Sequence, residues 1–119
     1  MSRLLLKPTL FTGICTLMLS LSSQAASFDC AKAKAADEIA ICANRSLNDQ
    51  DVTMALLYDL NKHFMAMGGR GSLMDGQADW LKQRRACGAR LSCLSDAYTQ
   101  RIGMLRGFID ERVMTKGPF

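Results

Sequence analysis

The chain has 119 residues, of which 49% are hydrophobic and 22% are charged, and its formal net charge is +4. This length supports one folded domain, so it excludes a multidomain enzyme, a membrane protein with several spans and a long repeat array. The high hydrophobic fraction and the balanced charge also exclude an intrinsically disordered chain.

Residues 1–25 have the layout of a secretory signal peptide. Arg3 and Lys7 form a basic start, and a run of apolar or small residues covers positions 9–21. A membrane span needs about 20 residues, so this run is too short to remain as an anchor. A small-x-small site ending at Ala25 predicts cleavage there. The mature domain is then residues 26–119, located in the periplasm or secreted, without stable insertion in the membrane.

Cleavage also changes the charge of the protein. Removal of Arg3 and Lys7 leaves 13 Lys and Arg residues against 11 Asp and Glu residues, which gives a mature charge of +2. A nearly neutral domain lacks the strong basic surface that nucleic-acid binding requires, so we expect no nucleic-acid partner.

The cysteines of the mature domain predict disulfide bonds. Cys15 leaves with the signal peptide, and Cys30, Cys42, Cys87 and Cys93 remain. An even number of cysteines in a small exported domain indicates two disulfides. A zinc site is the alternative, but the spacing departs from the close C-x2-C pairs that zinc favours, so we expect no metal.

Three pairings of four cysteines are possible. The local pairing joins Cys30 to Cys42 and Cys87 to Cys93, with stabilisation of about 3 and about 2.4 kcal/mol in the loop-entropy model. A Cys30–Cys87 bond would give about 4 kcal/mol in the same model, so energy alone does not decide. We favour the local pairing because neighbouring cysteines meet first as the chain leaves the membrane.

A Cys87–Cys93 bond also constrains the backbone. On a continuous helix, residues six positions apart are separated by about 9 Å along the axis and face different sides. A disulfide needs Cα atoms within about 7 Å, so the helix must end between the two cysteines. Gly88 is the residue that can end it.

The mature sequence is rich in helix-forming residues and has no stretch that alternates apolar and polar residues like a strand. Periodic apolar positions predict four helices, over Lys32–Asn44, Leu47–Met67, Leu73–Ala86 and Ser92–Met114. Asn48 or Ser46 is the expected cap of the second helix, and residues 68–72 are expected to form a flexible glycine-rich link. The predicted fold is all-α, a small disulfide-stapled bundle of three to four helices.

We find no constellation of catalytic residues. The single histidine, His63, is expected on a solvated helix surface, and the oxidised cysteines cannot supply a thiolate. The glycines at 68–71 lack the lysine and the Ser/Thr that follow the last glycine of a phosphate-binding loop. We therefore predict no catalytic residue, no cofactor and no enzymatic activity.

One set of polar residues is expected inside the bundle. Asp51, Arg84 and Arg101 lie on or beside the apolar stripes of three helices. Because a buried arginine needs a carboxylate partner, we predict that Asp51 pairs with Arg84 or Arg101. This pair would be structural.

Several short motifs occur together along the chain. They are Phe28-Asp29-Cys30-Ala31-Lys32-Ala33, Asp37-Glu38-x-x-Ile41-Cys42, Leu47-x-x-x-Asp51 followed by Tyr58, Gln77-x-x-Trp80-Leu81-x-x-Arg84-x-x-Cys87, and Cys93-Leu94-x-x-x-Tyr98-x-x-Arg101-Ile102-x-x-Leu105. Over residues 28–106 this combination resembles the family of the LprI-type lysozyme inhibitor N-terminal domain. We group Gln77, Trp80 and Tyr98 of these motifs with the predicted polar core.

The resemblance implies a small exported protein of bacterial envelopes that binds a protein partner, possibly lysozyme, and blocks it without covalent chemistry. Lysozymes are usually strongly basic, and a domain of charge +2 provides no long-range attraction toward them. A local acidic patch is therefore expected, with Asp49, Asp75 and Asp79 as candidates. The alternative is an envelope structural or regulatory protein that binds a bacterial cell-wall enzyme or another periplasmic partner.

Overall fold

The computed structural model describes residues 26–115, and for positions 113 and 114 it describes the backbone only. The predicted signal peptide lies outside the described residues. The described part consists of a short 3₁₀ helix (Cys30–Lys32), four α-helices and a terminal π-helical turn (Asp110–Met114), without strands. The α-helices are α1 (Ala36–Ala43), α2 (Arg45–Phe64), α3 (Met67–Ala86) and α4 (Leu91–Ile109). No helix in this part of the chain is long and apolar enough to cross a membrane.

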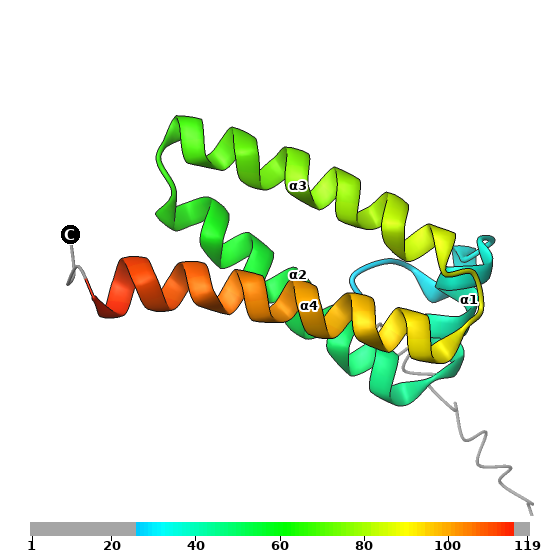
Figure 1. The fold of residues 1–119 in the computed structure, drawn as a ribbon. Coiled ribbons are helices and arrows are strands. Elements are labelled where there is room, and N and C mark those ends of the chain that lie inside the picture. The colour runs from blue at the N-terminus through cyan, green and yellow to red at the C-terminus, as the bar shows by residue number, and fades with distance from the viewer. Residues whose placement is uncertain (1–25, 116–119) are drawn as a thin grey trace, which may run out of the picture.

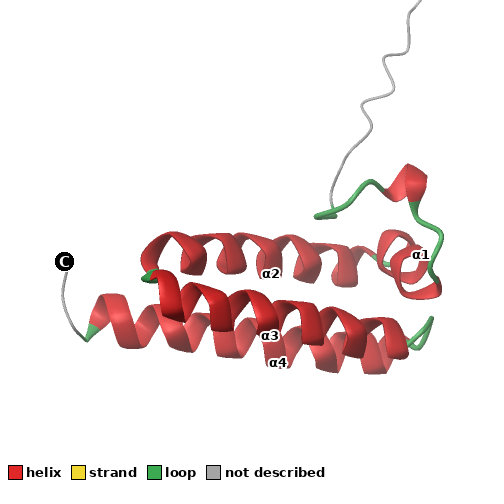
Figure 2. Ribbon diagram, turned by 90° about the horizontal axis from the view of Figure 1, so that it is seen from above, coloured by secondary structure: helices red, strands yellow, loops and turns green. Residues whose placement is uncertain are grey.

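The three long helices run side by side, and α1 closes one end of the bundle (Figures 1 and 2). The closest packing is between α2 and α4, while α3 contacts both of them and α1 contacts α2 and α3. The chain passes from α2 into α3 at the end opposite α1, and from α3 into α4 at the end next to α1 (Figure 1). The predicted all-α bundle is confirmed.

The junction between α1 and α2 depends on one asparagine. Asn44 has an extended backbone, and its side-chain oxygen accepts a hydrogen bond from the Leu47 amide at 3.1 Å. Its own amide donates to the carbonyl of Ala40, so the same residue ends α1 and begins α2. The Asn44 side chain thereby satisfies one of the free amides of the first turn of α2, that of Leu47. The prediction of Asn48 or Ser46 as the cap is therefore wrong, by four and two residues respectively.

The glycine-rich segment is helical. Residues 68–72 belong to the first turns of α3, so the prediction of a flexible link there is wrong. The chain reverses at Met65 and Ala66, whose backbones are extended. Met65 and Leu73 are buried on either side of the glycines. A glycine costs a helix about 1 kcal/mol relative to alanine, and the burial of these two side chains offsets that cost.

The turn between α3 and α4 follows the prediction for Gly88. This residue has φ +56°, the one described position with positive φ, and α3 ends just before it at Ala86. Glycine tolerates this left-handed conformation because it has no Cβ. The helix break brings the Cα atoms of Cys87 and Cys93 to 5.6 Å, and the two cysteines are bonded.

The second disulfide joins Cys30 to Cys42 and ties the segment before α1 to the end of α1. The helix predicted over Lys32–Asn44 begins only at Ala36 in the structure, so the segment that contains Cys30 is separate from α1. Asp29 caps a separate 3₁₀ turn by accepting a hydrogen bond from the Ala31 amide at 3.0 Å. Both disulfides therefore lie at the end of the bundle that α1 closes.

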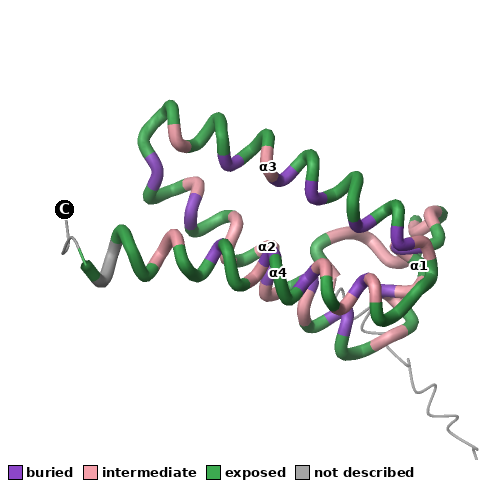
Figure 3. Tube along the Cα trace, viewed as in Figure 1, coloured by how far each residue is buried: buried purple, intermediate pink, exposed green. Residues whose placement is uncertain are grey.

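The core runs along the sides of the helices that face one another (Figure 3). Its fully buried members, with 0% exposure, are Ile41, Leu94, Tyr98 and Leu105. Asn61 is buried among them, and its amide donates to the carbonyl oxygens of Leu57 and Leu105 at 2.8 and 3.0 Å. The fourth predicted helix corresponds to α4 continued by the π-helical turn.

Candidate functional site

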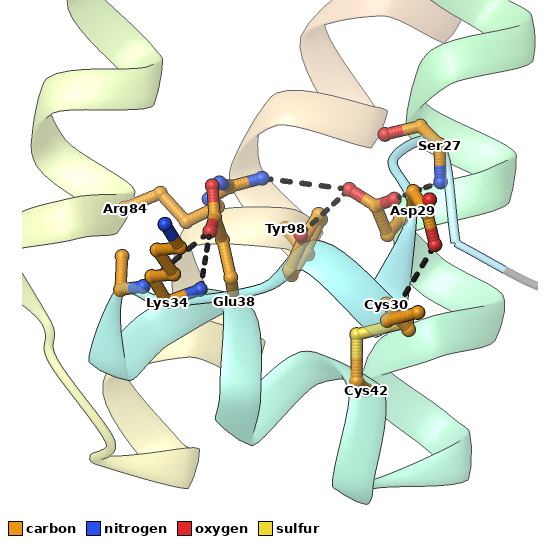
Figure 4. The surroundings of a disulfide bond; sticks show 11 residues. Ser27, Asp29, Cys30, Lys34, Glu38, Cys42, Arg84 and Tyr98 are labelled. Carbon is orange, nitrogen blue, oxygen red and sulfur yellow. Dashed lines mark hydrogen bonds and ion pairs between the residues drawn. A yellow bond between two sulfur atoms is a disulfide. The ribbon is translucent and has the colours of Figure 1, made fainter.

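A buried ion network lies where α1, α2, α3 and α4 meet. The Arg84 guanidinium donates through Nε to Asp37 Oδ2 at 2.9 Å, and its Nη1 lies 3.6 Å from Asp51 Oδ1. The Tyr98 hydroxyl donates to the same Asp51 oxygen at 2.8 Å. Figure 4 shows Arg84 and Tyr98 in the surroundings of the Cys30–Cys42 disulfide, with Tyr98 between Arg84 and the bonded cysteines. One cation thus connects carboxylates from α1 and α2.

The sequence indicated two possible partners for Asp51, and the structure pairs it with Arg84. The backbone amide of Ser27 donates to the other Asp51 oxygen at 2.6 Å, which attaches the first described residues to α2. Asp51 is therefore contacted by a cation, a phenol and a backbone amide. Its position inside the bundle, with 0% exposure, suits a structural role.

Burial and neighbouring charges set the protonation of this network. Burial and the adjacent Asp51 carboxylate raise the pKa of the Tyr98 phenol, so it remains a hydrogen-bond donor. Burial alone lowers the pKa of Arg84, but Tyr98 and Asp37 outweigh that effect and the net pKa is raised. The guanidinium also lies 5.5 Å from the Phe28 ring centre and 5.8 Å from the Trp80 ring centre. Arg84 is therefore held as a cation.

Asp37 is the member of the network that sequence reasoning missed. In the sequence, Asp37 and Glu38 lie near the start of a predicted helix, where acidic side chains interact favourably with the helix dipole. That interpretation gives no reason to place Asp37 in the core. Glu38 does accept from the Ala35 amide, at 3.4 Å, whereas Asp37 is 1% exposed and faces the core. The sequence did contain one signal that Asp37 is buried. Asp37 lies four residues before the apolar Ile41, so the two side chains share one face of the helix.

Arg101 has a different environment from Arg84. Its Nε donates to Gln77 Oε1 at 2.9 Å, and its Nη1 lies 3.5 Å from the Met104 sulfur. Gln77 in turn donates to the Met54 sulfur at 3.1 Å. No carboxylate contacts Arg101 in the described part of the chain, so its predicted alternative pairing with Asp51 is wrong.

Trp80 links α3 to α4. Its indole Nε1 donates to the Ala97 carbonyl at 3.0 Å, and its ring packs edge-on against Tyr98 with centres 5.2 Å apart. Trp80 and Tyr98 are both buried. The motif residues grouped as a polar core, Asp51, Arg84, Arg101, Gln77, Trp80 and Tyr98, are therefore all buried, in two neighbouring groups.

The three candidate partner-binding carboxylates do not form one cluster. Asp49 lines an open groove of about 820 Å³ between α2 and α4, together with Arg45 and Arg106. Asp75 and Asp79 are exposed on α3, and Asp79 forms a 2.9 Å ion pair with Lys82. The two aspartates of α3 share a helix face, and Asp49 lies among cations on another surface.

Side chains that could hold a metal ion are not grouped in the part of the chain that the structure describes. Within residues 26–115, no set of three or more His, Cys, Asp and Glu side chains could hold a metal ion. The His63 side chain is 74% exposed, and its Nδ1 contacts the Asp59 carbonyl within the same helix. The four cysteines of this region are bonded in pairs.

Comparison with protein families identifies the chain. The family model for lysozyme inhibitor LprI matches residues 30–105. The chain belongs to the LprI lysozyme inhibitor family. The match covers both disulfides and the complete buried network between Asp37 and Tyr98. No curated protein and no solved structure matches the chain.

Proposed function

We propose that this protein is an exported inhibitor that binds a muramidase and blocks it without covalent chemistry. The observation that carries the proposal is the LprI family match over residues 30–105. Two disulfides suit a protein that works outside the reducing cytosol, in the periplasm or secreted. The predicted signal peptide supports the same location.

The fold suits an inhibitor because the end of the bundle that α1 closes is held rigid by several cross-links. Both disulfides and the Arg84 network lie at the end of the bundle closed by α1. Covalent and ionic links across this end fix the relative positions of the helices before binding. A surface ordered in advance loses less conformational entropy when it docks, which improves affinity.

The docking surface that we propose is the acidic side of α3. Asp75 and Asp79 are four residues apart and share an exposed face, and Gln83 continues that face by another four residues. Gln83 lines a hollow between α3 and α4 together with Asp96. Asp75, Asp79 and Asp96 therefore flank one side of the α3–α4 pair, and Lys82 balances one of these charges through its ion pair with Asp79. The remaining negative charge favours a basic enzyme even though the whole domain is nearly neutral.

Asp49 is not part of this surface in our proposal. Arg45 and Arg106 line the same groove, so the local charge there is positive and opposes a basic partner. This difference provides a matched control, because Asp49, Asp75 and Asp79 are all exposed aspartates on helices.

The test is titration of the purified, disulfide-bonded protein against a basic lysozyme in a cell-wall lysis assay. We expect lysis to fall in proportion to the inhibitor added. The double variant Asp75→Asn, Asp79→Asn should inhibit about tenfold more weakly, as expected when two rim charges are lost. Asp49→Asn should inhibit like the wild type.

Undiminished lysis at a large molar excess of wild-type protein would overturn the proposed function. Equal inhibition by the α3 double variant and by Asp49→Asn would overturn the assigned surface and leave the function intact. A pull-down from periplasmic extract would then test the alternative, a bacterial cell-wall enzyme as partner.

A further inference from the structure

The end of the bundle opposite the disulfides contains a small pocket of about 210 Å³. It lies where the end of α2, the start of α3 and the end of α4 meet. Its apolar lining comes from Met65, Leu73, Met104 and Phe108. A cavity of about 150 Å³ is enough to hold benzene, so this one accommodates a short apolar group together with a small polar head.

The polar wall of this pocket carries a buried cation without a matching anion. Arg101 is 5% exposed, and its Nη2 is buried without any hydrogen-bond partner. Its hydrogen bonds go to neutral groups, the Gln77 amide oxygen and the Met104 sulfur, and Tyr58 also interacts with it electrostatically. A buried charge that lacks a charged partner is costly to a folded protein, and burial lowers the pKa of Arg101.

A second cation stands at the rim. Arg112 lines the pocket from the π-helical turn, and its Nη2 lies 3.8 Å from the position that a Cβ on Gly69 would occupy. No Asp or Glu lines the pocket. The contrast with Arg84 is clear, because Arg84 has Asp37 and Asp51 within reach.

We propose that this pocket binds a carboxylate carried on a short apolar chain. The carboxylate lies against the Arg101 guanidinium, whose Nη1 is 3.7 Å from the position that a Cβ on the pocket-lining Gly76 would occupy, and it accepts a hydrogen bond from Arg112. The apolar chain lies against Met65, Leu73 and Phe108. Arginine suits this role because its planar head matches the geometry of a carboxylate. The site is independent of the acidic surface proposed for muramidase binding, and it includes residues beyond the matched family region.

Two sources carry this chemistry: a free fatty acid and the last residue of a peptide with an apolar carboxyl terminus. Hexanoate represents the first and N-acetyl-leucylleucine the second. The tighter of the two identifies the source, and failure of both to bind overturns the proposal.

The experiment is an NMR titration that follows backbone amides and arginine Nε–Hε groups of the disulfide-bonded protein. Hexanoate should bind at least about tenfold more tightly than either 1-hexanol, which lacks the charge, or acetate, which lacks the chain. The shifts should centre on Arg101, Gly69 and Gly76. Equal affinities for hexanoate and both controls, or shifts centred on another surface, overturn the proposal.

Glycine variants test the pocket without removing the arginine. Gly69→Leu places a side chain beside Met65 and Arg112 and should reduce hexanoate affinity about tenfold. Gly71→Leu introduces the same residue on the same helix, where no atom lies within 4 Å, and should bind like the wild type. Equal affinities of these two variants contradict the assigned site.

A charge variant tests the assigned contact. Arg101→Met should abolish the preference for hexanoate over 1-hexanol, whereas Arg106→Met, an exposed arginine of the same helix outside the pocket, should retain it. An unchanged preference in Arg101→Met overturns the role of Arg101. If this variant does not fold, the glycine pair still decides the proposal.

Discussion

Replacing Asp37 with asparagine removes the negative charge from the shortest ion pair in the core. The Arg84 and Asp37 side chains are 6% and 1% exposed, and the contact between them is 2.9 Å. Removing one member of such a pair costs about 3–5 kcal/mol, because the other charge remains buried. Asp51 stays 3.6 Å from Arg84 and compensates in part, so we expect a loss of about 3 kcal/mol.

The Lys82–Asp79 pair provides the control. Its contact distance is also 2.9 Å, but its side chains are 77% and 68% exposed. Exposed pairs contribute little because water screens the charges. Asp79→Asn should therefore leave the free energy of unfolding almost unchanged. The two variants make the same chemical change at the same distance, so the difference between them measures the effect of burial.

The assay is urea unfolding followed by far-UV circular dichroism, with both disulfides oxidised. The free energy of unfolding from urea gives the expected loss directly. In a thermal melt of a domain of this size, the same loss in Asp37→Asn corresponds to a decrease in Tm of about 12 °C or more. The dependence of the unfolding free energy on urea should not change, since the surface exposed on unfolding is the same. A loss in Asp37→Asn no larger than in Asp79→Asn would refute the assignment of Asp37 to the buried network.

Three further predictions concern single features of the fold. Burial raises the pKa of the Tyr98 phenol in the folded protein. The neutral phenol therefore contributes its full stabilisation to the fold below the unfolded tyrosine pKa of about 10. Above that pH the free energy of unfolding should fall by about 1.4 kcal/mol per pH unit. Urea unfolding at several alkaline pH values should show this slope in the wild type and a shallower one in Tyr98→Phe, and equal slopes contradict the reasoning. Gly71→Ala should stabilise α3 by about 0.5–1 kcal/mol, since the residue is helical and open to solvent, whereas Gly88→Ala at φ +56° should destabilise the domain by about 1–2 kcal/mol. Thermal melts of both variants check this, and no gain from Gly71→Ala means that α3 does not include the glycines. Replacing Cys87 and Cys93 together by alanine should cost about 2.4 kcal/mol through the loss of a short closed loop, measured by urea unfolding against the reduced and oxidised wild type.

The sequence by itself determined the features that depend on neighbouring residues. Apolar periodicity and helix-forming composition predicted the helices, and an even cysteine count predicted the disulfides. The geometry of Cys87 and Cys93 placed a helix break at Gly88, which the structure contains. These predictions succeed because helix geometry and short loops fix the relevant distances within a few residues.

Only the tertiary structure decided the features that depend on how the helices face one another. The glycines at 68–71 have low helix propensity, yet they are helical because the flanking side chains of Met65 and Leu73 are buried in the core. Asp37 and Arg84 are 47 positions apart, and nothing local indicates that the side chains meet. The same holds for Arg101, whose contact with Gln77 depends on the rotation of α4 against α3. Helix rotation and crossing are set by the summed packing of the whole core, and no short stretch of sequence contains that information.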